Sequence, residues 1–300
     1  SIMDRRRLFF GAENAVAVIG FGLFGGGYSA SRTNYTDKYT YSGDTVAAGT
    51  VLGLARNSLA ATGNATVGIF GGGYSASPST YTDKYTYSGD TVVAGTVLGL
   101  ARHSLAATGN ATVGIFGGGY RSGYENYTDK YTYSGDTVVA GTVLGLARNA
   151  LTSTGNATVG IFGGGYRSGY KNYTDKYTYS GDTVVAGTVL GYYRSYLAAT
   201  GNATVGIFGG GDANGDTNYT DKYTYSGDTV AAGTVLGLAR NGLTSTGSST
   251  VGIFGGGSAS GSRTNYTDKY TYSGNTVAAG TVLGLVRAYF SACSATANGL

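Results

Sequence analysis

The sequence predicts an all-β fold, a six-bladed β-propeller with four antiparallel strands in each blade. Three observations lead to this prediction: a repeat of 46 residues, short β-rich runs divided by tight-turn residues, and no apolar pattern of helical period. The repeat is marked by Gly-Gly-Gly triplets that begin at Gly25, Gly71, Gly117, Gly163, Gly209 and Gly255. Repeats of roughly 20–50 residues are typical of solenoids and propellers, and four short strands in each repeat are typical of a propeller blade.

Each repeat carries four strand signals, which we letter a to d. They occupy residues 56–62 (a), 65–70 (b), 37–41 (c) and 45–52 (d), together with their copies. The c run, Asp-Lys-Tyr-Thr-Tyr, alternates so that Tyr39 and Tyr41 share one face of the strand. Ser-Gly-Asp at 42–44 and Gly-Asn at 63–64 separate the runs, and these residue types tolerate the positive φ of tight hairpin turns.

The composition excludes several classes of protein. The single Cys argues against a disulfide framework or a Cys-cluster metal site, and the single His leaves little for zinc or for His-based catalysis. A net charge of +4 over 300 residues is too small to indicate a nucleic-acid groove. The hydrophobic content of 41% suffices for a core, so the 55 Gly do not indicate a disordered chain. We expect neither a cofactor nor a metal.

One propeller domain is expected over residues 16–300, preceded by a basic arm at 1–15. Length alone suggests two domains, but the 46-residue period continues from Gly25 to the end of the chain. The arm contains three consecutive arginines, 5–7, followed by apolar residues. Glu13 interrupts the apolar run, which favours an arm and a structural strand over a secretion signal. No run approaches the ~18 apolar residues of a membrane span.

The two ends of the chain are expected to close the ring. Residues 17–24 match strand b, and residues 285–292 match strand a. The simplest closure therefore pairs the C-terminal strand with the N-terminal one and leaves no open edge. Residues 7–11 could compete for the same place. The strand left over could then complete a neighbouring copy, so a homo-oligomer through terminal strands is an alternative.

Several features of the repeat resemble the kelch repeat: Phe70 followed by Gly-Gly-Gly, the paired aromatics Tyr85 and Tyr87, and Arg102 ahead of a small apolar strand. In kelch blades a glycine doublet ends strand b, an aromatic residue lies in strand c and an arginine opens strand a. The resemblance spans about residues 16–297 and recurs six times. Kelch blades usually carry a tryptophan in strand d. This chain has no Trp, so we expect tyrosines to replace its packing.

The tyrosine- and threonine-rich sequence of the repeats is also similar to tandem repeats of bacterial and bacteriophage tail and other virion proteins. That resemblance implies a place on a virion or a cell surface. The kelch family includes copper enzymes of the galactose-oxidase type, whose copper needs a pair of histidines. This chain has one His, so that activity is not carried over. We see no nucleophile–base pair and no paired carboxylates, and we predict no catalytic residues.

Differences among the six copies show where a blade leaves its residues free to vary. The a–b turn stays near Thr-Gly-Asn-Ala-Thr, and the c–d turn stays near Tyr-Ser-Gly-Asp-Thr. Variation is concentrated in the b–c loops and in the connections from strand d to the next strand a. In an up-and-down blade these two sets of loops emerge on one face. We call it the variable face, and we call the face with the a–b and c–d turns the uniform face.

Tyrosines and arginines gather in the variable loops. Eighteen of the 28 tyrosines belong to the repeated motif Tyr-Thr-Asp-Lys-Tyr-Thr-Tyr and are expected to pack the blades. The candidate binding residues are Tyr120, Arg121, Tyr124, Tyr166, Arg167, Tyr170, Tyr192, Tyr193 and Tyr196. Tyrosine offers rigid contact area with a polar tip, which suits a patch for protein or sugar. The alternative is that these tyrosines only plug one end of the propeller.

Four other features favour structural roles. Residues 212–218 carry Asp and Asn at alternate positions, like the start of a calcium loop. Tyr223 stands where an EF-hand has its bidentate Glu, so we expect an Asx-rich turn instead. The repeated arginines, Arg56 and its copies, are expected to bond backbone carbonyls or the repeated aspartates between blades. We expect His103 to be an exposed substitution and Cys293 a small buried thiol.

Together these features predict a non-catalytic structural and interaction module. Its expected partners are other structural proteins of a larger assembly, on a virion or a cell surface, bound through the variable face. Neither nucleic-acid binding nor membrane insertion is expected. One alternative is a lectin, in which loop tyrosines stack on sugar rings and Asn, Asp and Arg side chains bond hydroxyls. A second alternative is an intracellular kelch adaptor, although no flanking partner domain is evident in the sequence.

Overall fold

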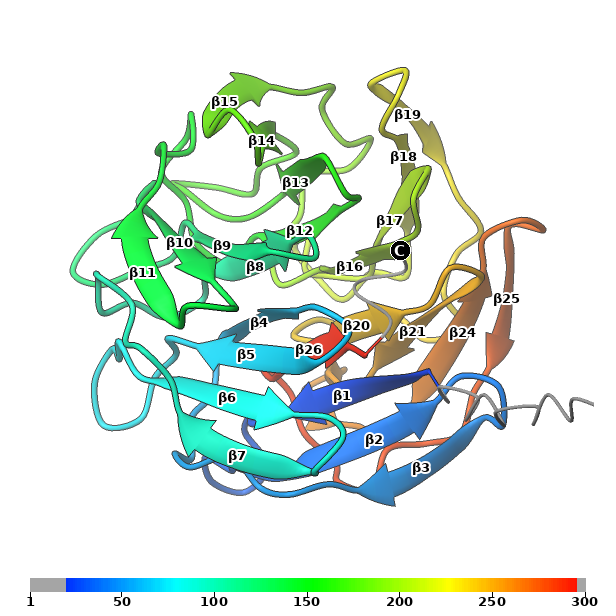
Figure 1. The fold of residues 1–300 in the computed structure, drawn as a ribbon. Coiled ribbons are helices and arrows are strands. Elements are labelled where there is room, and N and C mark those ends of the chain that lie inside the picture. Colours follow the sequence, from blue (N-terminus) through cyan, green and yellow to red (C-terminus); the bar gives the residue numbers. More distant parts are fainter. Residues whose placement is uncertain (1–19, 296–300) are drawn as a thin grey trace, which may run out of the picture.

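The computed structural model describes residues 20–295. These residues form six four-stranded antiparallel sheets and one two-stranded hairpin, and they contain no helix. The sheets are arranged as blades of a ring, with strand a of each blade near the axis and strand d at the rim (Figure 1). The six-bladed β-propeller predicted from the repeat is confirmed.

The blades follow one another along the chain. Blade 1 contains β26 (Ser291–Ser294), β1 (Phe21–Gly25), β2 (Thr36–Thr40) and β3 (Thr45–Ala48). Blades 2 and 3 contain β4 (Ala60–Gly63), β5 (Val67–Gly71), β6 (Thr82–Thr86) and β7 (Thr91–Ala94), then β8 (Ala106–Gly109), β9 (Val113–Gly117), β10 (Thr128–Thr132) and β11 (Thr137–Ala140). Blades 4 and 5 contain β12 (Thr152–Gly155), β13 (Val159–Gly163), β14 (Thr174–Thr178) and β15 (Thr183–Ala186), then β16 (Ala198–Gly201), β17 (Val205–Gly209), β18 (Thr220–Thr224) and β19 (Thr229–Ala232). Blade 6 contains β20 (Thr244–Gly247), β21 (Val251–Gly255), β24 (Thr267–Thr271) and β25 (Thr276–Ala279), and its b–c loop forms the hairpin of β22 (Ser258–Ala259) and β23 (Ser262–Arg263).

The C-terminal strand closes the ring, as expected. β26 pairs antiparallel with β1, with Ser294 opposite Gly22 and Ser291 opposite Gly25. Strand a of blade 1 therefore comes from the opposite end of the chain to strands b, c and d (Figure 1). The rival segment, residues 7–11, and the basic arm at 1–15 lie outside the described residues.

Strand a is shorter than the sequence suggests. It was expected at 56–62 but begins at Ala60, so Arg56 belongs to the connection that precedes the strand. Strand d likewise ends at Ala48 rather than at residue 52. The physical reason at Arg56 is its side chain, which leaves the connection to form an ion pair with Asp83 in strand c of the same blade.

The glycine triplets combine close packing with a sharp turn. A Cβ added at Gly71 would lie 2.7 Å from Cε1 of Phe116 in the next blade, a distance that real side chains do not tolerate. Gly72 and Gly73 have φ values of +66° and +97°, in the region that favours glycine. The first glycine therefore lets the blades approach, and the next two turn the chain onto the variable face.

The hydrophobic core lies between neighbouring blades. Ile69 of blade 2 packs in one cluster with Phe116 and Tyr131 of blade 3, and the other junctions repeat this arrangement. In strand d, where a kelch blade has its tryptophan, the half-buried Val46 packs against a cluster that includes Tyr39 and Tyr41.

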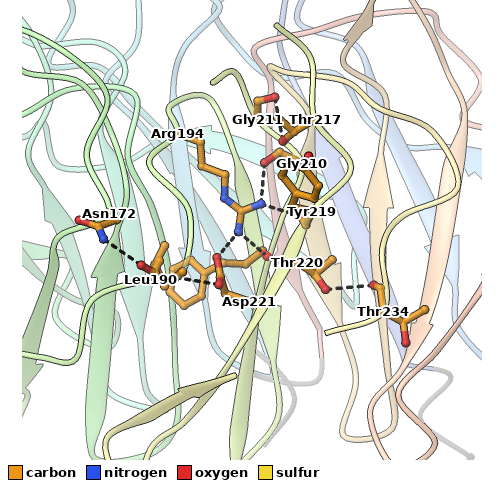
Figure 2. Close-up of polar contacts among 12 residues, drawn as sticks. Asn172, Leu190, Arg194, Gly210, Gly211, Thr217, Tyr219, Thr220, Asp221 and Thr234 are labelled. Atoms are coloured by element: carbon orange, nitrogen blue, oxygen red, sulfur yellow. Dashed lines mark hydrogen bonds and ion pairs between the residues drawn. The ribbon is translucent and has the colours of Figure 1, made fainter. Parts of the chain in front are cut away.

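Every blade contains a buried Arg–Asp ion pair. Figure 2 shows the pair of blade 5, in which Arg194 Nη2 lies 2.6 Å from Asp221 Oδ2 and also donates to the carbonyl oxygen of Phe208. The expectation that the arginines bond aspartates and carbonyls is confirmed, but the pairs lie within a blade and not between blades. Desolvation makes such a pair costly unless its hydrogen bonds are satisfied, and burial accordingly raises the pKa of Asp221 while Arg194 lowers it.

A second repeated contact joins neighbouring blades near the axis. The hydroxyl of Tyr133 in blade 3 lies 3.0 Å from Oγ1 of Thr62 in blade 2, and four other junctions have the same Tyr–Thr pair. Where blade 1 meets blade 2, Cys293 stands in place of the threonine, with Sγ 3.3 Å from the Tyr87 hydroxyl. Cys293 is buried, as expected, and burial raises its thiol pKa to about 12.

Candidate functional site: the variable face

The b–c loops and the d–a connections do form one face. In blade 2 the backbone N–H of Tyr74, in the b–c loop, donates to the carbonyl of Asn57 in the preceding connection, at 2.8 Å, and Asn57 donates back. Equivalent bridges join His103 to Tyr120 and Asn149 to Tyr166. The turns that are nearly identical in all copies lie at the opposite ends of the strands, on the uniform face.

At the axis, the six connections hydrogen-bond to one another in a closed circle. The residue of each connection nearest the axis donates its backbone N–H to the carbonyl of the equivalent residue in the preceding blade, over 2.6–2.9 Å. These residues are Ser58, Ser104, Ala150, Tyr196, Gly242 and Tyr289, and all have φ between 51° and 61°. We call them the axial ring. Because five of the six are not glycine, this left-handed conformation is held by the circle of hydrogen bonds and not by local preference.

Two tyrosines of the axial ring cover the axis. The rings of Tyr196 and Tyr289 meet edge to face with centroids 5.3 Å apart. Gly242, between them in the circle, leaves room for Tyr289, whose ring carbon Cε1 would lie 2.7 Å from a Cβ at that position. Burial raises the pKa of the Tyr196 hydroxyl, which also hydrogen-bonds with Ser104. Beside the ring, a cavity of about 130 Å³ is lined by the a strands. Tyr196 therefore lies at the axis, packed against Tyr289, and not in an open loop.

Four of the predicted tyrosines join a continuous aromatic arc across blades 2 to 4. Successive ring centroids along the arc are 5.4–6.3 Å apart. The arc runs through Tyr74, His103, Tyr120, Tyr124, Tyr166 and Tyr170. Aromatic pairs at these distances stabilise one another beyond simple burial.

His103 differs from the expectation of an exposed substitution. Its ring is half-buried between Tyr74 and Tyr120, and burial lowers its pKa below the ordinary value of 6.5. His103 Nδ1 also lies 3.0 Å from the hydroxyl of Ser104. A single-residue change from the asparagine of other copies gave no sign of this role, because the neighbouring rings come from two other loops.

The remaining predicted residues do not join the arc through any contact found in residues 20–295. Arg121 and Arg167 are exposed at the tips of the arc's own loops. Tyr192 stacks on Tyr219, with centroids 4.3 Å apart and planes 12° apart, above the buried Arg194. Tyr193 is 62% exposed, which makes it the most exposed tyrosine in the described chain. The nine residues therefore divide into the arc with its two arginines, the axial Tyr196, and a Tyr192–Tyr193 pair.

Contacts between neighbouring blades on the variable face are of three kinds over the six junctions. At five junctions a residue of one b–c loop reaches the next b–c loop, and at the sixth His103, in a connection from strand d to strand a, lies between two loops; the contacts are cation–π, aromatic or hydrogen bonds to a carboxylate. The contacts are Arg263 over Tyr28, Arg32 over Tyr74, His103 between Tyr74 and Tyr120, Tyr124 with Tyr166, Tyr170 with Asp212, and Asp216 with Ser260. The sequence prediction missed Arg32, Arg263 and Tyr28, and comparing the last loop residue of one copy with the first of the next would have suggested them.

Beyond the end of the arc, the loop of blade 5 is acidic and borders a hollow. The hollow, of about 640 Å³, is open to solvent and lies among the loops of blades 4, 5 and 6. The Asx-rich turn is as expected: Gly215 N–H donates to Asp212 Oδ1 at 2.9 Å. We name this region the blade-five hollow; its polar and aromatic lining residues are Tyr170, Asp212, Asn214, Asp216, Asn241 and Ser260.

Comparison of the chain with models of known protein families and with curated proteins finds no match. The fold and the variable face therefore carry the functional argument. Among residues 20–295 no helix is long and apolar enough to cross a membrane.

Proposed function

We propose that this chain is a non-catalytic interaction module that binds a partner through the variable face. The observation that carries the proposal is the aromatic arc, which sits in the loops that vary most and is flanked by the exposed Arg121 and Arg167. Tyrosine and arginine are enriched where binding energy concentrates in protein interfaces. The opposite face presents short repeated turns of Gly, Asn, Asp, Ala, Ser and Thr and lacks an exposed cluster of tyrosines and arginines in the described residues.

The proposal extends to the class of protein and its setting. The glycine triplet that ends strand b, the aromatic residues of strand c and the arginine ahead of strand a support a kelch-type propeller. The tyrosine-rich repeats support a place in a virion or on a cell surface, with another structural protein as the partner. Two observations support the non-catalytic part of the proposal: Ser104, the hydroxyl beside His103, is buried, and no carboxylate bonded to His103 is found in residues 20–295.

Carbohydrate binding is the second candidate. The blade-five hollow favours it, because an aromatic side chain, carboxylates and amides surround one open depression at the end of the arc. An interaction module on a surface could use both features, the arc for a protein and the hollow for a glycan.

Site-specific photo-cross-linking tests the proposed function. We would place p-benzoylphenylalanine at Tyr166 in the arc and, as the matched control, at the exposed Thr112 on the uniform face. We expect Tyr166 alone to capture a defined partner in extracts of the source, in competition with unlabelled wild-type protein. The competition should be lost when the competitor carries Tyr124→Ala and Tyr166→Ala. Equal capture from both faces, or no capture from Tyr166, would contradict the proposal.

A further inference from the structure

The blade-five hollow has the size and the rigidity of a small-ligand site. Its volume of about 640 Å³ falls within the range of roughly 300–1,000 Å³ found for ligand pockets. Tyr170 stands at one side of it, with its ring held edge to face against Tyr166 at 5.7 Å and its hydroxyl donating to Asp212 Oδ2 at 3.0 Å. The aromatic side chain is therefore fixed in place before any ligand arrives.

Both carboxylates of the hollow are oriented by neutral donors. Asp212 accepts hydrogen bonds from the N–H of Gly215 and from the hydroxyl of Tyr170. Asp216 accepts hydrogen bonds from the side-chain amide of Asn241 and from the N–H of Ser260, both at 2.6 Å. No Lys or Arg forms an ion pair with either carboxylate in the part of the chain that the structure describes. A carboxylate offers about four acceptor positions, so each keeps about two for a ligand.

The rest of the lining mixes donors with acceptors. Asn214 is exposed and provides an amide that can donate and accept, and the exposed Ser260 adds a hydroxyl. Ala239 supplies an apolar patch. A ligand that matches this lining carries several groups that both donate and accept, next to a surface of C–H bonds. A pyranose ring has that pattern, whereas an ammonium group only donates and leaves the amide donors without partners.

We propose that the blade-five hollow binds one pyranose unit of a saccharide, with Asp212, Asp216 and Asn214 bonding its hydroxyls and Tyr170 contacting its C–H face. The inference rests on the proposed use of the variable face for binding and identifies the ligand class of one part of it. The hollow shares only Tyr170 with the arc, so variants of Asp216 and Asn214 test the hollow separately from the arc.

Saturation-transfer-difference NMR with methyl glycosides tests the hollow. The probes are the methyl glycosides of glucose, galactose, mannose and N-acetylglucosamine, with methylammonium as a competing ligand class. We expect saturable transfer to at least one glycoside and an affinity loss of about tenfold or more in Asp216→Ala, as for loss of a hydrogen bond to a charged group. Transfer to methylammonium alone, or to no glycoside, would overturn the proposal.

A second variant distinguishes the loss of a ligand contact from unfolding of the loop. Asn214 has φ 65°, so Asn214→Gly keeps the backbone conformation and removes only the amide. We expect it to weaken glycoside binding while the control Ser226→Ala, on the uniform face of the same blade, binds as the wild type does. Unchanged binding in Asn214→Gly would count against the assigned geometry. If glycosides fail to bind but Tyr166 still captures a partner, the proposed function survives and the saccharide inference does not.

Discussion

Both faces of the propeller carry contacts that join neighbouring blades, but the contacts repeat on one face and differ on the other. On the uniform face, the amide of Asn64 in blade 2 donates to the carbonyl of Ala111 in blade 3, and Asn110, Asn156 and Asn202 repeat this bond at 3.1–3.2 Å. On the variable face, the six junctions use three kinds of contact, from the cation–π contact of Arg263 over Tyr28 to the hydrogen bond between Ser260 and Asp216. One face repeats a single bond, and the other matches each loop to its particular neighbour.

The difference shows that a loop residue that varies between copies can still be constrained by contacts with the neighbouring blade. Neighbouring loops differ together from one junction to the next. Tyr124 contacts the ring of Tyr166 at one junction, whereas Tyr170 donates a hydrogen bond to Asp212 at the next. Variation alone therefore does not identify a binding surface. The side chains that take part in none of these junction contacts are better evidence, and these are Arg121, Arg167, Tyr193 and, in the blade-five hollow, Asn214.

The largest expected effect comes from raising the pH, and it acts on contacts common to all blades. The hydroxyls of Tyr133 and its five equivalents, Tyr41, Tyr87, Tyr179, Tyr225 and Tyr272, are buried, and this burial raises the pKa of each above the ordinary value of 10. The unfolded chain therefore releases these protons first. Stability is fully present below about pH 10 and falls above it, by roughly 1.4 kcal/mol per pH unit for each group, or roughly 8 kcal/mol per unit for six.

Urea unfolding at a series of alkaline pH values measures this slope. Tyr133→Phe should reduce the slope by about one sixth, whereas Tyr193→Phe, at an exposed position, should leave it unchanged. A free energy of unfolding that stays level through this pH range would show that the six hydroxyls are not buried as described.

A smaller effect is expected at the turns of the uniform face. Asn156 accepts three hydrogen bonds at Oδ1, from the N–H of Thr158, from its hydroxyl and from the N–H of Val159, and its amide bridges to Ala203. Asn156→Ala should cost about 1–2 kcal/mol, since it removes the turn cap and the bridge together. Because Asn110 has the same partners, Asn110→Ala should cost the same within about 0.5 kcal/mol by urea unfolding. Clearly unequal costs would break the description of this face as uniform.

The smallest effect is expected at a junction of the variable face. Tyr170→Asp would place a second carboxylate against Asp212, and we expect a loss of about 0.5–1 kcal/mol relative to Tyr170→Phe, since the site is open to solvent. The loss should shrink as salt is added, which separates charge repulsion from lost packing. If both variants are equally stable at every salt concentration, neighbouring loops are not matched by charge.

Most of the fold could be predicted from the sequence, and much of the site could not. The triplets at Gly25 and its copies defined the period, the alternation around Tyr39 defined strand c, and the match of residues 285–292 to strand a indicated the closing strand. The start of strand a was misplaced at Arg56, because a long-range ion pair with Asp83 decides it. Comparison of the copies identified four tyrosines of the arc, Tyr120, Tyr124, Tyr166 and Tyr170. It did not predict that their rings contact one another, or that His103 extends the arc to Tyr74.

The sequence by itself determined the repeating unit, because strand alternation and turn chemistry act over a few residues and recur every 46. Only the tertiary structure decided which loops touch. Ring closure by β26 sets the distance between neighbouring blades, and this distance brings Tyr196 to Tyr289 over the axis and Tyr170 to Asp212 beside the hollow. Contacts of that kind join residues about 40 to 90 positions apart, where no local preference of the chain can act.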